Sequence, residues 1–168
     1  GQSNLEIAAG IIEHVRAAIP QGASVTEFYA GVGAIGLSVL DRAGEIRLNE
    51  INPHSLQGLE LGLAALDAAT RARISIITGP AGTAHLPASG AQVVIADPPR
   101  KGLDVGLTSY LSEHPPERFV YVSCGLDSFL RDAGQLMSRG KLRLGSLTAF
   151  NLMPFTEHVE TVARFERA

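Results

Sequence analysis

Ser24-Val25-Thr26-Glu27-Phe28-Tyr29-Ala30-Gly31-Val32-Gly33 is the stretch that decides the fold. Its first five residues predict a strand, and its two glycines predict a tight turn into a helical pattern at 35–40. A glycine turn between a strand and a helix is typical of the ligand-binding end of an open α/β sheet. With Gly36 it also fits the dinucleotide pattern Gly-x-Gly-x-x-Gly, so a nicotinamide cofactor, S-adenosylmethionine and a purely structural turn all stay open at this point.

Strands and helices alternate on both sides of this turn. Further strands are expected at 45–50, 73–77, 92–96 and 119–122, and helices at 4–19, 35–40, 53–69, 81–86, 104–113 and 127–137. This alternation predicts a mostly parallel sheet in an α/β fold. The last two strand-like runs, 141–150 and 158–165, have no helix between them, which predicts an antiparallel hairpin at the edge of the sheet.

The composition is typical of a globular protein, with 45% hydrophobic and 18% charged residues. A length of 168 residues predicts one domain, residues 1–168. We expect no membrane span, no leader and, because a single cysteine excludes an internal disulfide, a cytoplasmic setting. The histidines lack metal-ligand spacing, so no metal is expected, and we expect a monomer. A net charge of −3 argues against a strong, non-specific grip on nucleic acid by this chain alone.

Two acidic residues follow strands at the same end of the predicted sheet. Glu50 ends the second strand, where a carboxylate can accept hydrogen bonds from the ribose hydroxyls of an adenosine. Asp97-Pro98-Pro99-Arg100 follows the fourth strand, and its prolines restrict the loop so that Asp97 faces a ligand and Arg100 faces outward. The alternatives are a solvated carboxylate at Glu50 and a merely structural Asp-Pro turn.

Cys124, the only cysteine, follows the fifth strand at this same end. A free cysteine often packs as a small hydrophobic residue. As a thiolate it is instead a nucleophile for covalent catalysis. The neighbouring motifs favour the nucleophile, which should then be partly accessible.

These stretches together resemble the RNA (uracil-5-)-methyltransferases, bacterial enzymes that make 5-methyluridine in tRNA and 23S rRNA. The matching stretches run in family order over nearly the whole chain: Gln2-Ser3-Asn4, Phe28 to Gly33, Glu50, Asp97 to Leu103, Tyr121 to Cys124, Leu130-Arg131-Asp132 and Met153 to Glu160. The resemblance implies a three-layer, Rossmann-like class I methyltransferase fold with strand order 3-2-1-4-5-7-6. It also implies S-adenosyl-L-methionine as cofactor and tRNA or rRNA as substrate.

The resemblance further implies residue roles. Cys124 matches the nucleophile that adds to C6 of a uracil, and Glu160 matches the base that removes the C5 proton. The positions expected to contact the cofactor are Gln2, Tyr29, Gly31, Gly33, Glu50 and Asp97. Placement in the chain adds Arg100, Phe155 and His158 as candidates on the substrate side. The structural alternatives are a core aromatic residue for Phe155 and a hydrogen-bonded histidine for His158.

Two features depart from the family pattern. The usual Ser-Cys-Asn-Pro is replaced by Ser123-Cys124-Gly125-Leu126, which predicts a less rigid loop after the nucleophile. The family's N-terminal RNA-binding portion has no counterpart, so we expect the catalytic part of a longer protein. A methyltransferase of the same fold acting on an amine, which would not need Cys124 or Glu160, remains an alternative. A nicotinamide-dependent oxidoreductase and a non-catalytic cofactor-binding module also remain.

Overall fold

A computed structural model describes residues 4–83, 90–151 and 159–168. Its seven-stranded sheet has the order β3-β2-β1-β4-β5-β7-β6. The strands are β1 (Ala23–Phe28), β2 (Ala43–Glu50), β3 (Ile74–Thr78), β4 (Val93–Ala96), β5 (Arg118–Ser123), β6 (Leu142–Asn151) and β7 (Val159–Arg167). β1 to β5 pair in parallel, whereas β7 lies antiparallel between β5 and β6. The predicted strand order and C-terminal antiparallel hairpin are confirmed.

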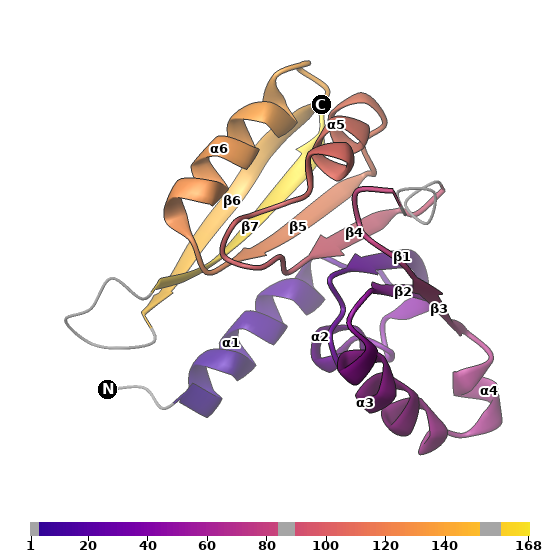
Figure 1. Ribbon diagram of the computed structural model, residues 1–168. Helices are drawn as coiled ribbons and strands as arrows, with labels where there is room; N and C mark the ends of the chain where they lie inside the picture. The colour runs from indigo at the N-terminus through magenta and orange to yellow at the C-terminus, as the bar shows by residue number, and fades with distance from the viewer. Residues whose placement is uncertain (1–3, 84–89, 152–158) are drawn as a thin grey trace.

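Helices cover both faces of this sheet (Figure 1). They are α1 (Asn4–Ala17), α2 (Ala34–Ser38), α3 (Pro53–Ala64), α4 (Ala68–Arg71), α5 (Val105–Glu113) and α6 (Leu126–Met137). One core cluster joins the sheet to α1 and α3, and the other joins it to α5 and α6. None of the helices in the described ranges is both long and apolar enough to cross a membrane.

β5 illustrates why the central strands read as continuous apolar runs. Val120 and Val122 belong to the α1 side of the core, and Phe119 and Tyr121 belong to the α6 side. Successive strand residues point to opposite faces, and both faces are covered, so both sets are buried. Cys124 comes directly after β5 and therefore lies at the end of a rigid central strand.

The single helix expected at 53–69 is wrong, because the chain forms two helices there. α3 begins at Pro53, where the Asn52 side chain accepts hydrogen bonds from backbone N–H groups of the first turn, and it ends at Ala64. Asp67 then caps a second helix, since its Oδ1 accepts from the Thr70 N–H at 2.9 Å. Of the helix expected at 81–86, residues 81–83 form a turn instead, and residues 84–86 lie outside the described residues.

Candidate active site

The glycine turn after β1 is held by Glu50 at the end of β2. Glu50 Oε1 accepts a hydrogen bond from the Gly31 N–H at 2.7 Å, and Oε2 accepts from the N–H groups of Ile51 and Asn52, each at 2.8 Å. Gly31 and Gly33 have φ values of 60° and 88°, which side chains rarely adopt. Glu50 therefore positions the turn and keeps only part of its acceptor capacity for a ligand.

Tyr29 connects the same turn to the beginning of α5. Its hydroxyl accepts from the Asp104 N–H at 2.8 Å and donates to Asp104 Oδ1 at 3.0 Å. Burial raises the pKa of Tyr29 above its usual range, so the hydroxyl keeps its proton. Tyr29 has a φ of 59°, a strained value for a non-glycine residue that these two hydrogen bonds help to maintain.

A cleft of about 560 Å³ opens at the carboxyl ends of β1, β2 and β3. Tyr29, Glu50 and Asp97 all line it, so three of the predicted cofactor residues meet there. Asn49 also lines it and donates to the carbonyls of Ile77 and Gly79, which fixes the far wall. Apart from its chain neighbours, no atom of the described residues lies within 4 Å of where a Cβ on Gly79 would stand, so the space beside this glycine is open.

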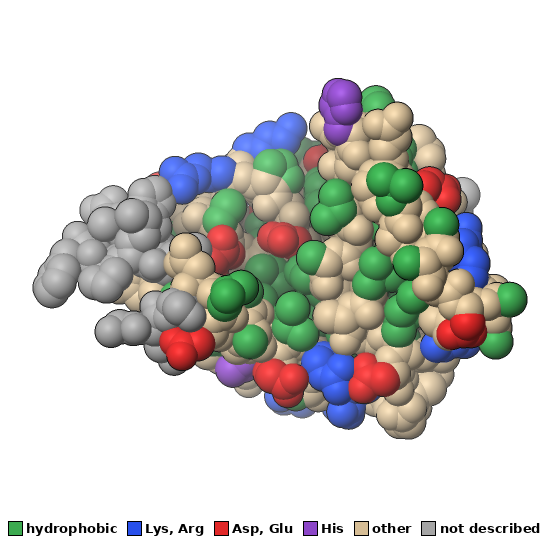
Figure 2. Space-filling view, turned by 90° about the horizontal axis from the view of Figure 1, so that it is seen from below, with side chains coloured by type: hydrophobic (Ala, Val, Ile, Leu, Met, Phe, Trp, Pro, Cys, Tyr) green, Lys and Arg blue, Asp and Glu red, His purple; other side chains and the backbone are tan. Residues whose placement is uncertain are grey.

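A second cleft lies between the sheet and helices α1 and α2. Ala8, Ile11, Ile35 and other apolar side chains line it, together with the carboxyl groups of Asp97 and Glu160. Figure 2 shows acidic side chains among hydrophobic ones on the face seen from below.

The pKa values of the Asp97 and Glu160 carboxyl groups are both raised in this cleft. Burial, and secondly the charge of Asp97, raise the pKa of Glu160 to about 7. The Asp97 side chain contacts solvent in the clefts, but protein surrounds it closely enough that desolvation raises the pKa of its carboxyl to about 6. A carboxyl with a pKa near neutrality is suited to exchanging protons at physiological pH.

Glu27 is an acid in this region that the sequence patterns did not single out. It lies in β1, only 1% exposed, and its Oε2 has no hydrogen-bond partner among the described residues. Burial, followed by the charge of Asp97, raises its pKa well above the usual range. A backbone hydrogen bond from Gly36 opposes that shift and connects Glu27 to α2. Glu27 therefore supports α2 through the Gly36 N–H.

Cys124 is half-buried and lines a cleft of about 710 Å³ with Arg100, Val159 and the first turn of α6. Ser123 on β5 faces Thr161 on β7 in the antiparallel pairing, so Cys124 and Glu160 lie one position beyond this pair. The fold thus brings the predicted nucleophile and base to the ends of neighbouring strands. They line adjoining clefts rather than one, with Val122 and Glu160 in the apolar cleft.

The loop after Cys124 is held by side chains although it lacks the Asn-Pro pair. Ser123 Oγ accepts from the Gly125 N–H at 3.2 Å, and Ser128 Oγ donates to the carbonyl of Arg100 at 2.7 Å. A Cβ on Gly125 would stand 2.9 Å from that Arg100 carbonyl oxygen. A glycine is therefore required at this position by close packing, and the asparagine of the family pattern would not fit without a shift.

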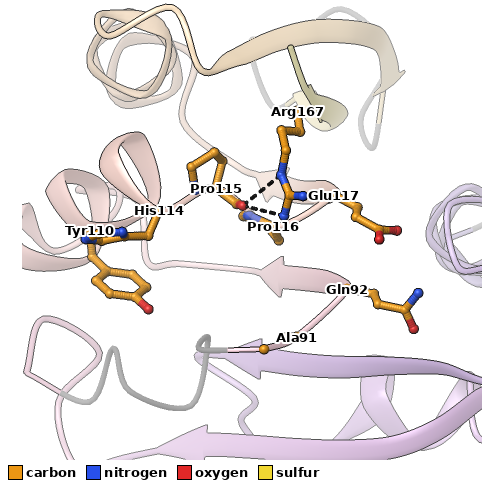
Figure 3. A pocket seen from close by; sticks show the side chains of 9 residues that line it. Ala91, Gln92, Tyr110, His114, Pro115, Pro116, Glu117 and Arg167 are labelled. Atoms are coloured by element: carbon orange, nitrogen blue, oxygen red, sulfur yellow. Dashed lines mark hydrogen bonds between the residues drawn. The ribbon is translucent and has the colours of Figure 1, made fainter.

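Three predicted site residues, Gln2, Phe155 and His158, lie outside the described residues. A further cleft, of about 350 Å³, lies at the opposite end of the strands and is lined by Gln92, Tyr110 and Arg167 among others (Figure 3). Arg167 closes one side by donating to the Pro115 carbonyl. Those predicted catalytic and cofactor residues that the structure describes do not line this cleft.

No protein-family model matches the chain. The chain is 37% identical over 166 residues to an uncharacterized RNA methyltransferase of Protochlamydia amoebophila, which covers 99% of this chain and 43% of that protein. It is 30% identical over 149 residues to the 23S rRNA (uracil(747)-C(5))-methyltransferase of Pyrococcus abyssi, with 88% of this chain and 34% of that protein covered.

Among solved structures, the tRNA (uracil-54, C5)-methyltransferase of Pyrococcus abyssi in complex with S-adenosyl-L-homocysteine superimposes with a TM-score of 0.78 and 26% sequence identity. The match covers 94% of this chain and 38% of that one. The chain therefore spans less than half the length of these relatives.

Proposed function

We propose that this chain is the catalytic part of an S-adenosylmethionine-dependent enzyme that methylates C5 of a uridine in tRNA or rRNA. The premise is that the chain belongs to the RNA methyltransferases, to which it is similar over nearly its whole length. The observation that supports the proposal is that Cys124 and Glu160 each lie one position beyond the Ser123–Thr161 pair, at the ends of neighbouring strands, and that Asp97 is close enough to Glu160 to raise the pKa of its carboxyl.

The cleft of about 560 Å³ at the ends of β1 to β3 has features that fit the cofactor. Glu50, Asn49 and Asn52 offer polar groups on one side, and Asp97 stands at the side nearest the apolar cleft. The perturbed carboxyl groups of Asp97 and Glu160 are suited to a neighbouring cation, since a positive charge favours their ionised forms. When bound, S-adenosylmethionine supplies an electrophilic methyl group on a positively charged sulfur.

The residues of the chain would divide the remaining chemistry between them. C5 of uracil is a weak carbon nucleophile, and addition of the Cys124 thiolate to C6 makes C5 an enolate carbon that can take the methyl group. Glu160 then removes the proton from C5, the C6–S bond breaks, and Cys124 leaves as a thiolate. A pKa of Glu160 of about 7 allows this carboxyl to accept a proton at neutral pH and release it to solvent.

The target uracil would have to leave its stacking on the neighbouring bases of the RNA to reach Cys124. Cys124 is half-buried, and the cleft that it lines has Arg100 at its rim. A uridine in a loop can turn its base into such a cleft, whereas a paired base cannot. Arg100 is exposed and would contact a phosphate at the entrance.

RNA that contains 5-fluorouridine tests this proposal directly. Fluorine at C5 cannot leave as a proton, so the protein incubated with this RNA and S-adenosylmethionine should form an adduct that survives denaturing electrophoresis. Cys124→Ala should abolish the adduct, and Asp41→Asn, a surface change beside Arg16, should not affect it.

Glu160→Gln should accumulate an adduct even with ordinary uridine, because the proton at C5 stays in place. Absence of any adduct with tRNA and rRNA fragments would refute the covalent route. Methylation that persists in Cys124→Ala would instead favour an amine as the acceptor. A thermal shift with S-adenosylhomocysteine but not with NAD would exclude the nicotinamide alternative.

A further inference from the structure

Residues 97–104, here called the bridging segment, lie between the cofactor cleft and the cleft of Cys124. Asp97, Pro99 and Lys101 line the former, and Arg100 lines the latter. Since one short stretch of backbone borders both clefts, its position determines how far the cofactor site lies from the thiol. A group that fixes this segment would act on the reaction without touching either reactant.

Asp132, on the inner side of α6, is such a group. Its side chain is only 1% exposed, and Oδ2 accepts from the Leu103 N–H at 2.9 Å and from the Tyr121 hydroxyl at 2.7 Å. Burial, and then Asp132 itself, raise the pKa of Tyr121 above its usual range, so that hydroxyl remains a donor. One buried oxygen thus connects the bridging segment to α6 and to β5.

Arg131 adds a second connection between the same two elements. Its Nη2 donates to the Lys101 carbonyl at 2.6 Å and pairs with Asp132 Oδ1 at 3.3 Å. Asp132 therefore also orients the side chain that holds Lys101.

The bridging segment and α6 approach so closely that a side chain would not fit at two glycine positions. Gly102, with φ 93°, would place a Cβ 2.5 Å from Asp132 Oδ2, and Gly125 lies against the Arg100 carbonyl in the same way. Ser128 donates to that carbonyl from the first turn of α6. The bridging segment is consequently packed against the helix that begins two residues after Cys124.

We propose that Asp132 is a positioning residue that holds the bridging segment against α6, and thereby keeps Cys124 and the cofactor cleft at one spacing. Its kinetic consequence rests on the proposed function, but its structural consequence does not. α6 already packs through Phe129, Ala133 and Leu136, so a carboxylate is not needed to bury the helix. An apolar residue of similar size at position 132 would pack equally well, so the carboxylate matters because it accepts the hydrogen bonds of Leu103 and Tyr121.

Two variants with one control test the structural part by hydrogen exchange. Asp132→Ala removes all the acceptors, whereas Asp132→Asn keeps an oxygen for Leu103 and Tyr121 but turns an amide N–H toward Arg131. Backbone exchange at 100–104 and 124–128 should rise about tenfold or more in Asp132→Ala and less in Asp132→Asn, with β1 unchanged. Asp41→Asn should leave exchange in both segments as in the wild type.

The kinetic part is read from the rate of adduct formation with 5-fluorouridine RNA and the affinity for S-adenosylhomocysteine. The rate should fall about tenfold to a hundredfold in Asp132→Ala, since small displacements of a reacting group have effects of that size. The affinity should change less than about threefold, because Tyr29 and Gly82 hold the other end of the segment at Asp104. Asp132→Asn should restore part of the rate.

The possible results separate the two proposals. Exchange that is unchanged in both segments, or that rises throughout the molecule, overturns the positioning role, as does an equal loss of rate and affinity. If the wild type forms no adduct at all, the proposed function fails, and the exchange experiment still decides what Asp132 does.

Discussion

The glycine turn depends on the charge of Glu50, so the isosteric change Glu50→Gln should loosen it. In the wild type, Oε2 serves the N–H groups of Ile51 and Asn52, and Oε1 serves that of Gly31. In the variant the amide oxygen can still accept the two hydrogen bonds from the N–H groups of Ile51 and Asn52. The NH₂ group then faces the Gly31 N–H, so that a donor meets a donor.

The expected loss is one charge-assisted hydrogen bond and part of the strength of two others, about 1–3 kcal/mol in the free energy of unfolding. Glu50 is only partly buried, which places the expectation in the lower half of that range. Each kcal/mol lowers the melting temperature of a domain of this size by roughly 2–4 °C. A decrease of roughly 2–8 °C should therefore be seen.

Circular dichroism melts measure this decrease, and calorimetric titration with S-adenosylhomocysteine measures its effect on the cleft. Glu45→Gln is the matched control, because Glu45 is exposed on the same strand and should change stability by less than about 0.5 kcal/mol. If Glu50→Gln melts and binds like Glu45→Gln, the reasoning about the turn is wrong.

Burial raises the pKa of Glu160 from 4.5 to about 7, so the folded protein holds this proton more tightly than the unfolded chain does. The free energy of unfolding should fall as pH rises from about 4.5 to about 7, and urea titrations of Glu160→Gln should lack that part of the slope. Leu126→Pro, at the first position of α6, should raise stability by about 0.4–1 kcal/mol because Gly125 is already extended, and a lower melting temperature would contradict this. Tyr29→Phe loses both hydrogen bonds to Asp104 and should lose about 1–3 kcal/mol in urea unfolding, whereas an unchanged midpoint would show that they contribute nothing.

The strands could be predicted from sequence because burial on both faces demands uninterrupted apolar runs, as in β4 and β5. Helix ends were harder to predict. The apolar spacing of α3 continues past Ala64, but the Leu66 N–H donates to the Leu63 carbonyl in a tightened last turn, and Asp67 then captures the Thr70 N–H to begin a new helix. Such a competition between a side chain and the backbone leaves no mark in the hydrophobic pattern.

For the candidate site, the position of a residue was easier to predict than the contacts that it makes. Tyr29 and Glu50 do line one cleft at the ends of β1 to β3, yet the Tyr29 hydroxyl and most of the Glu50 acceptors are already occupied by the protein. The partner of Tyr29 is 75 positions away, so no local pattern could reveal it. Asp132 lies within a stretch that matches the family, but it accepts a hydrogen bond from Leu103, which only the fold brings near.

The place of β7 in the sheet has a consequence for how the protein is made. β6 leaves the ribosome before β7, but it reaches β5 only through β7. Until the last strand is synthesised, β5 and β6 are both unpaired edges, and the strand that carries Glu160 does not yet exist. A nascent chain that has completed the cleft at β1 to β3 is therefore still without Glu160, and it exposes two unpaired strand edges that are prone to pair with other chains.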